Sequence, residues 1–101
     1  MTVKNGLPPI HPGEFLAEIL EDLKMSQAEF ARRIGVPRMR ISYIISGQRP
    51  VTAEMACLFG KAFNQSPDYW TGLQSDYDVK IARENLKDRL GTIQPIQFAI
   101  A

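Results

Sequence analysis

The stretch SQAEFARRIGVPRMRISYIISGQR, residues 26–49, decides the fold because it joins two short helical patterns through a turn. Ser26 is a favoured N-cap residue, and Glu29 three positions later completes a capping box. Gly35 suits the positive φ at which many helices end, and Pro37 fits at or beside the first residue of a new helix. The stretch therefore predicts a helix-turn-helix.

The second helix of this stretch has two chemically different faces. Ile41, Ile44 and Ile45 recur at helical spacing, so we expect them in the core. The opposite face carries the candidates for reading DNA bases: Arg38, Met39, Ser42 and Tyr43. Arginine donates two hydrogen bonds to guanine, and an apolar side chain such as methionine contacts the thymine methyl group. Other polar residues nearby are candidates for phosphate contacts, which fix the register on DNA: Gln27, Arg33, Arg40, Ser46 and Arg49.

Charge is unevenly distributed, although the formal net charge is only +1. Residues 26–50 contain five arginines and one glutamate, whereas residues 14–24 contain four acidic residues and one lysine. A basic surface beside an acidic one orients a domain on a polyanion such as DNA. The alternative interpretation is a solvated face on which the charges cluster by accident.

Three further helices are expected, at about residues 12–24, 53–64 and 67–90. The first has a core stripe: Phe15, Leu16, Ile19, Leu20 and Leu23. The helix at 53–64 is mostly apolar, so we expect it to be largely buried and Cys57 to be a small buried hydrophobic residue. The third begins with an aromatic face, allows a break near residues 76–78, and ends at Gly91.

A chain of 101 residues is expected to form a single domain, with an irregular arm at 1–10, a DNA-binding domain at 11–75, and a helix and tail at 76–101. Proteins of this size often gain stability by oligomerising, so a homodimer is expected. The candidates for contact with a second subunit or another partner are mostly apolar: Trp70, Leu73, Tyr77, Ile81, Ile96 and Phe98.

The tail has the alternation of a β-strand, because Ile96, Phe98 and Ile100 are separated by single residues. It can add to the sheet edge of a partner, pair with the tail of a second subunit, fold back on the preceding helix, or stay partly disordered. The sequence leaves these alternatives open.

Several function classes find no support in the sequence. The single Cys57 excludes an internal disulfide, and the single His11 has no metal-ligand spacing to other residues, so it is expected to dock the arm or the first helix. We find no phosphate-binding glycine loop and no Ser–His–Asp set, and we expect no cofactor, no metal and no enzymatic activity. No apolar run reaches the length of about 18 residues that a membrane span needs, and we expect a cytoplasmic protein.

Residues 26–49 resemble the helix-turn-helix of phage Cro and repressor proteins, the XRE family. A wider set of strings is similar to the HigA-type antitoxins of toxin–antitoxin operons: HPGEFL at 11–16, SQAEFARRIGVPRMRIS at 26–42, ISGQRPVTAEMACLFGKAF at 45–63 and SPDYWTGLQSDYD at 66–78. The resemblance covers roughly residues 9–85. It implies an all-α fold, a five-helix lambda-repressor-like DNA-binding domain with an extended C-terminal helix and a short tail.

The resemblance also implies two partners. HigA-type proteins are expected to repress their own operon by binding operator DNA as a dimer, and to neutralise a RelE-like, HigB-type toxin that cleaves messenger RNA. The alternative is a stand-alone XRE-family regulator without a toxin partner. A small basic open reading frame beside the gene would favour the antitoxin.

Overall fold

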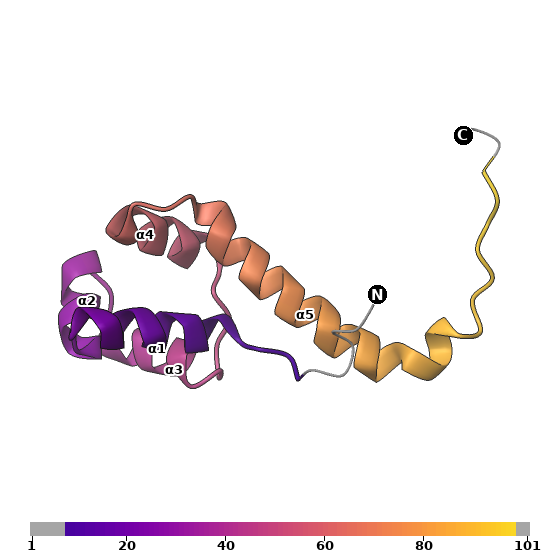
Figure 1. Cartoon of the computed structure of the whole chain (residues 1–101), viewed down its shortest axis with the longest axis horizontal. Coiled ribbons are helices and arrows are strands. Elements are labelled where there is room, and N and C mark those ends of the chain that lie inside the picture. The colour runs from indigo at the N-terminus through magenta and orange to yellow at the C-terminus, as the bar shows by residue number, and fades with distance from the viewer. Residues whose placement is uncertain (1–7, 99–101) are drawn as a thin grey trace.

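The computed structural model describes residues 8–98, and these residues form five α-helices and no β-strand (Figure 1). The helices are α1 (Pro12–Leu23), α2 (Gln27–Ile34), α3 (Arg38–Ile45), α4 (Ala53–Phe63) and α5 (Pro67–Leu90). The first four helices gather around the beginning of α5, whereas the rest of α5 projects away from them (Figure 1). The expected all-α, five-helix architecture is confirmed.

The caps of α2 form largely as the sequence predicts. The Ser26 side chain accepts a hydrogen bond from the Glu29 backbone N–H at 3.0 Å. Gly35 ends the helix with φ of 76°, and Pro37 is the N-cap of α3. The expected capping box is only half formed, because the Glu29 carboxylate accepts from the Arg33 guanidinium at 2.9 Å. An arginine one turn away competes for this carboxylate with the N-cap backbone.

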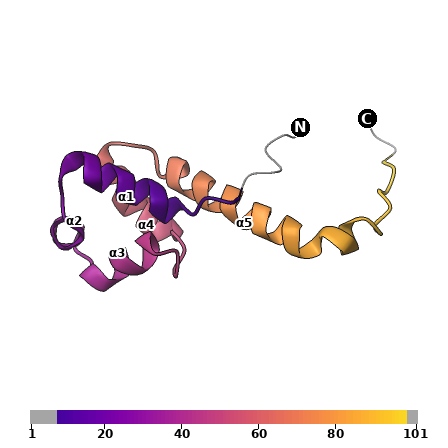
Figure 2. The same ribbon diagram turned by 60° about the horizontal axis from the view of Figure 1, so that its bottom comes forward.

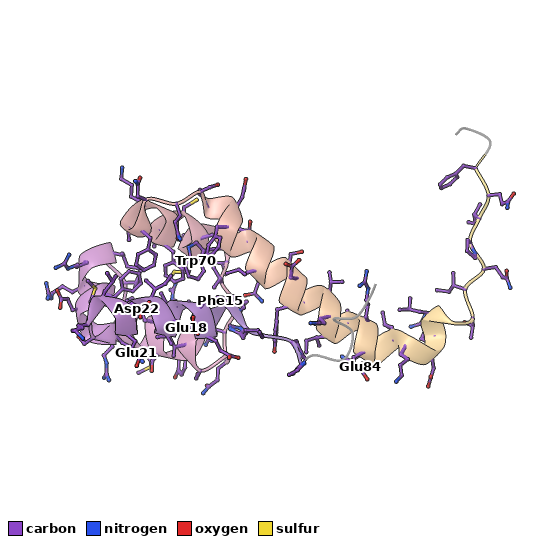
Figure 3. The ribbon with its side chains drawn as sticks, in the orientation of Figure 1. Phe15, Glu18, Glu21, Asp22, Trp70 and Glu84 are labelled. Carbon is purple, nitrogen blue, oxygen red and sulfur yellow. The ribbon has the colours of Figure 1, made fainter. Side chains whose placement is uncertain are left out.

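Aromatic side chains join α2, α4 and α5 into one core. The Phe30 and Phe63 rings stack at 5.1 Å, and the Phe59 ring meets the Trp70 ring edge to face, also at 5.1 Å. Trp70, in the first turn of α5, packs its ring against α4 and has no exposed surface (Figure 3). Its indole N–H donates to Gln65 Oε1 at 2.9 Å. The prediction that Trp70 contacts a partner is therefore wrong, because this ring fills the protein's own core.

Four details of the helices differ from the sequence prediction. Cys57 and Ala62 are exposed, because α4 buries only the side that carries Met55, Ala56 and Phe59. Leu23 is 52% exposed, since it lies in the last turn of α1 and lines an open groove beside α4. α5 is unbroken from Pro67 to Leu90, so the break that the sequence allowed near residues 76–78 is absent. The division of the chain after residue 75 stays a prediction.

Beyond α5, residues 93–98 have no regular secondary structure, and Ile96 and Phe98 are more than four-fifths exposed. Ile100 and most of the predicted arm, residues 1–7, lie outside the described residues. Within the described part of the chain, no helix has the length and apolar character of a membrane span.

Candidate nucleic-acid interface

The outer face of α3 carries the four predicted base-reading residues. Arg38 and Met39 are exposed, and Ser42 and Tyr43 are partly exposed. The opposite side of the helix is anchored, since Ile41 and Ile44 have 0% and 1% exposure. In Figure 2, α3 lies along the lower edge of the domain with α1 above it. This face is therefore open to a large ligand while its backbone is held by the core.

α1 holds α3 through a very close backbone approach. Gly13, in the first turn of α1, lies so near the end of α3 that a Cβ built on it would be 1.9 Å from the Ile44 carbonyl oxygen. α2 also contacts α3, and Ala31 of α2 is 2% exposed. Two small residues thus set the position of α3.

The loop after α3 is fixed by hydrogen bonds and by an aromatic contact. The backbone N–H groups of Gln48 and Arg49 donate to the Tyr43 carbonyl at 2.9 and 3.2 Å, and Ser46 Oγ donates to the same oxygen at 3.1 Å. The Arg49 guanidinium lies 5.4 Å from the centre of the Tyr43 ring, within the range of a cation–π contact. Arg49 is thereby placed beside the predicted base-reading face.

α5 holds the other end of this loop. The Val51 N–H donates to Gln74 Oε1 at 2.7 Å, and Gln74 Nε2 donates to Asp78 Oδ1 at 2.9 Å. Gln74 is only 8% exposed, so it supplies a buried acceptor to a backbone N–H of the loop before α4, which is outside any helix.

The candidate phosphate contacts come from α2, α3 and this loop. Arg33 pairs with Glu29 at 2.9 Å, and Arg40 Nη1 donates to Met55 Sδ at 3.7 Å. The Arg33 side chain is 60% exposed, and a surface ion pair contributes only about 0–1 kcal/mol. Exchanging Glu29 for a phosphate therefore costs Arg33 little. The assignment of base and phosphate contacts stays a prediction.

His11 caps α1, which agrees with the expected docking role. Its Nδ1 accepts from the Gly13 N–H at 2.9 Å, and its ring meets the Tyr77 ring edge to face at 4.9 Å. Burial lowers the pKa of His11 below its ordinary value of 6.5, and the carboxylates of Asp78 and Glu14 oppose this shift only in part. The described residues contain no group of three or more potential metal ligands.

The lowered pKa of His11 makes the free energy of unfolding depend on pH. Protonation of His11 favours the unfolded chain, in which the pKa is higher, and it also removes the acceptor for the Gly13 N–H. The stabilisation by His11 is complete above pH 6.5 and is lost as the pH falls through the folded-state pKa. We expect the urea midpoint of the unmodified chain to fall when the pH is lowered from 7.5 to 5.5. The midpoint of His11→Asn, which keeps a capping oxygen but does not titrate in this range, should fall less. An equal fall in both proteins would contradict this role.

Sequence reasoning from single residues missed three residues that position this candidate interface. Gly13, Gln74 and Asp78 are neither charged readers nor periodic core residues. Their only signal was their place in the strings HPGEFL and LQSDYD. The structure explains why these residues are needed. Gly13 lets α1 approach Ile44 without a Cβ in the way, and Gln74 and Asp78 form a chain of hydrogen bonds that ends at Val51.

Comparison with known proteins decides the family. Residues 16–70 match the Helix-turn-helix family. An addiction module antidote protein of the HigA family from Coxiella burnetii superposes with a TM-score of 0.86 and 37% sequence identity, over 89% of this chain and 100% of that chain. The chain belongs to the HigA-type antitoxins of the XRE helix-turn-helix family. The resemblance seen in the sequence is therefore confirmed.

Two further relatives of this HigA-type chain are informative. The structure of PA4674 from Pseudomonas aeruginosa, in complex with its operator DNA, superposes with a TM-score of 0.85 and 34% identity, over 89% of this chain and 97% of that chain. Virulence-associated protein A' of Dichelobacter nodosus is 36% identical over 83 residues, which are 81% of this chain and 72% of the relative. Members of the family are thus DNA-binding regulators and antitoxins.

Proposed function

We propose that the chain is a sequence-specific repressor that binds the operator of its own operon as a homodimer. The observation that carries the proposal is the outer face of α3, where Arg38, Met39, Ser42 and Tyr43 project from a helix anchored by a buried isoleucine side. The operator complex of PA4674 supports it, because that relative shares the fold over most of both chains. Two such helices would enter successive major grooves about 34–36 Å apart.

The replacement Arg38→Ala tests base reading. We expect it to weaken binding to the DNA immediately upstream of the chain's own gene by about 1–3 kcal/mol, and to relax base preference at one position in each half-site. Fluorescence anisotropy with single-base variants of the site measures both effects. Arg32→Ala, an exposed arginine of α2 outside the predicted contacts, is the matched control. Unchanged affinity and preference in Arg38→Ala would remove Arg38 from the readers.

The replacement Arg49→Ala tests the phosphate contacts. We expect it to weaken specific and non-specific DNA alike, and to reduce the salt dependence of binding by about one ion per subunit. A titration of the binding constant against salt concentration measures the slope, with Arg32→Ala again as the control. A slope equal to that of the unmodified chain would show that Arg49 contacts no phosphate.

We further propose that the chain neutralises a messenger-RNA-cleaving toxin of the RelE-like, HigB type. Family membership supports this role, and so does the acidic outer side of α1, where Glu18, Glu21 and Asp22 are exposed (Figure 3). A toxin that cleaves RNA must bind a polyanion, and a basic surface suits that task. Acidic residues on α1 provide the complementary charge for such a partner.

Co-expression of the chain with the product of the adjacent small basic open reading frame tests this second role. We expect a stable complex that forms with the unmodified chain and is lost when Glu18, Glu21 and Asp22 are all replaced by lysine, while operator binding is retained. A genome position without such a reading frame, or a product that does not bind, would favour the alternative of a stand-alone XRE-family regulator.

A further inference from the structure

The ring of His11 touches three separate parts of the molecule, although it has only 7% exposed surface. It caps α1 through the Gly13 N–H, and it meets the Tyr77 ring of α5 edge to face at 4.9 Å. Its third neighbour is the loop after α3, because a Cβ built on Gly47 would lie 3.8 and 3.9 Å from the Cγ and Cδ2 atoms of His11. The ring is therefore packed between α5 and this loop.

The loop that the ring touches is the one that carries Arg49. The Arg49 guanidinium lies over the Tyr43 ring, and the Tyr43 carbonyl accepts the Arg49 N–H. At the far end of the loop, the Val51 N–H donates to α5. The His11 ring lies between these two points, against Gly47 and close enough to the Arg49 backbone for a hydrogen bond that favours its charged form. It is thus a third support of the loop.

The hydrogen bond to Gly13 decides where the ring carries its proton. Because Nδ1 accepts from the Gly13 N–H, the neutral imidazole has its hydrogen on Nε2. A second proton must go to Nδ1, where two donors would then face each other at the start of α1. The ring is almost fully buried, so it cannot turn away from this clash without displacing its neighbours Gly47 and Tyr77. The protonated chain therefore needs a different arrangement of the loop.

The surroundings of the ring favour its neutral form. Burial lowers the pKa of His11 below 6.5, and this effect outweighs three opposing ones: the carboxylate of Asp78 on α5, the carboxylate of Glu14 on α1, and the backbone of Arg49. Tyr77 adds only the edge of its ring. The ring is thus neutral above pH 6.5, and it takes up a proton only in more acidic solution.

We propose that His11 is a positioning residue for operator binding: its neutral ring holds the loop so that Arg49 reaches a phosphate, and a proton on the ring releases the loop. The inference rests on the proposed function, since it concerns DNA bound by this loop. Protonation and DNA binding then oppose each other, and the opposition is reciprocal, so bound DNA makes the ring harder to protonate. Phosphate charge alone would have the opposite effect, because a nearby anion favours the imidazolium.

A histidine titration by nuclear magnetic resonance tests this coupling. His11 is the only histidine of the chain, so the Cε1–H signal of an untagged protein reports this ring alone. The full chain is titrated between about pH 8 and pH 5, free and bound to the DNA upstream of its own gene. We expect bound DNA to lower the pKa of His11 by at least about 0.5, which equals about threefold weaker binding by the protonated chain. A pKa that is unchanged or raised, or a ring that titrates in neither sample, would overturn the proposal.

A double-mutant cycle tests whether His11 acts through Arg49. His11→Asn keeps a capping oxygen for α1 but loses the ring that contacts the loop. We expect it to weaken operator binding at least about threefold near neutral pH, and less than about twofold when Arg49 is already alanine. Ser66→Asn, which changes the exposed N-cap of α5, is the control and should leave binding unchanged. Circular dichroism checks that each variant is folded. Equal losses in the two backgrounds would overturn the positioning role.

These outcomes separate the inference from the proposed function. If the chain binds its upstream DNA and the pKa of His11 does not fall, the inference fails and the repressor role stands. If the chain binds no such DNA, the repressor role fails, and the support of the loop is measured in the free chain. There the backbone amide signals of residues 47–49 should follow the titration of His11 and lose this dependence in His11→Asn. Amide signals that do not follow the titration would overturn the contact.

Discussion

Replacing Gly13 with alanine is expected to lower the free energy of unfolding by about 2–4 kcal/mol. The added Cβ would lie 1.9 Å from the Ile44 carbonyl oxygen and 2.8 Å from the Ile45 Cα, so backbone rather than a flexible side chain must move. Because Pro12 is also buried at this junction, α1 cannot slide away without opening the core. Urea unfolding followed by circular dichroism measures the loss.

The Gly13→Ala molecules that stay folded should also bind DNA more weakly, because the backbone atoms that must move belong to the end of α3. Glu14→Ala is the matched control: it adds no atom to the junction and removes only a first-turn charge, worth at most about 1 kcal/mol. A Gly13→Ala protein whose unfolding free energy lies within about 0.5 kcal/mol of the unmodified chain would show that α1 and α3 are less closely packed than described.

Local chemistry made the helix-turn-helix predictable. Ser26, Gly35 and Pro37 act within one turn of their own positions, so their residue types suffice to place the ends of α2 and α3. The outward position of Arg38 followed from the same periodicity that buries Ile41. Such inferences need no knowledge of which helix packs against which.

The errors concern packing between distant segments. Helical spacing indicated an aromatic face on α5, but it did not show that Trp70 would fill the core formed with α4. Cys57 was misplaced for the same reason, because a mostly apolar helix that packs against one layer still exposes its far side. The contact between Gln74 and Val51 joins residues 23 positions apart, which no local pattern reveals.

Replacing Gln74 with leucine is expected to destabilise the fold by about 2–4 kcal/mol and to weaken operator binding. Leucine has a similar size but cannot accept the Val51 N–H, and a buried unpaired donor costs about 1–3 kcal/mol. The bond from Gln74 to the Asp78 carboxylate is lost as well. Since Val51 follows the loop that carries Arg49, relaxation of this loop would also move a proposed phosphate contact.

Gln48→Leu is the matched control, because it makes the same chemical change at an exposed position in the same loop. We expect its unfolding free energy to stay within about 0.5 kcal/mol of the unmodified chain. A Gln74→Glu variant separates the two effects: it keeps an acceptor for Val51 but places a second carboxylate beside Asp78. If Gln74→Glu binds DNA better than Gln74→Leu despite this repulsion, the acceptor for Val51 positions the loop. Equal binding by the two variants would mean that Gln74 stabilises the core without setting the loop on which Arg49 lies.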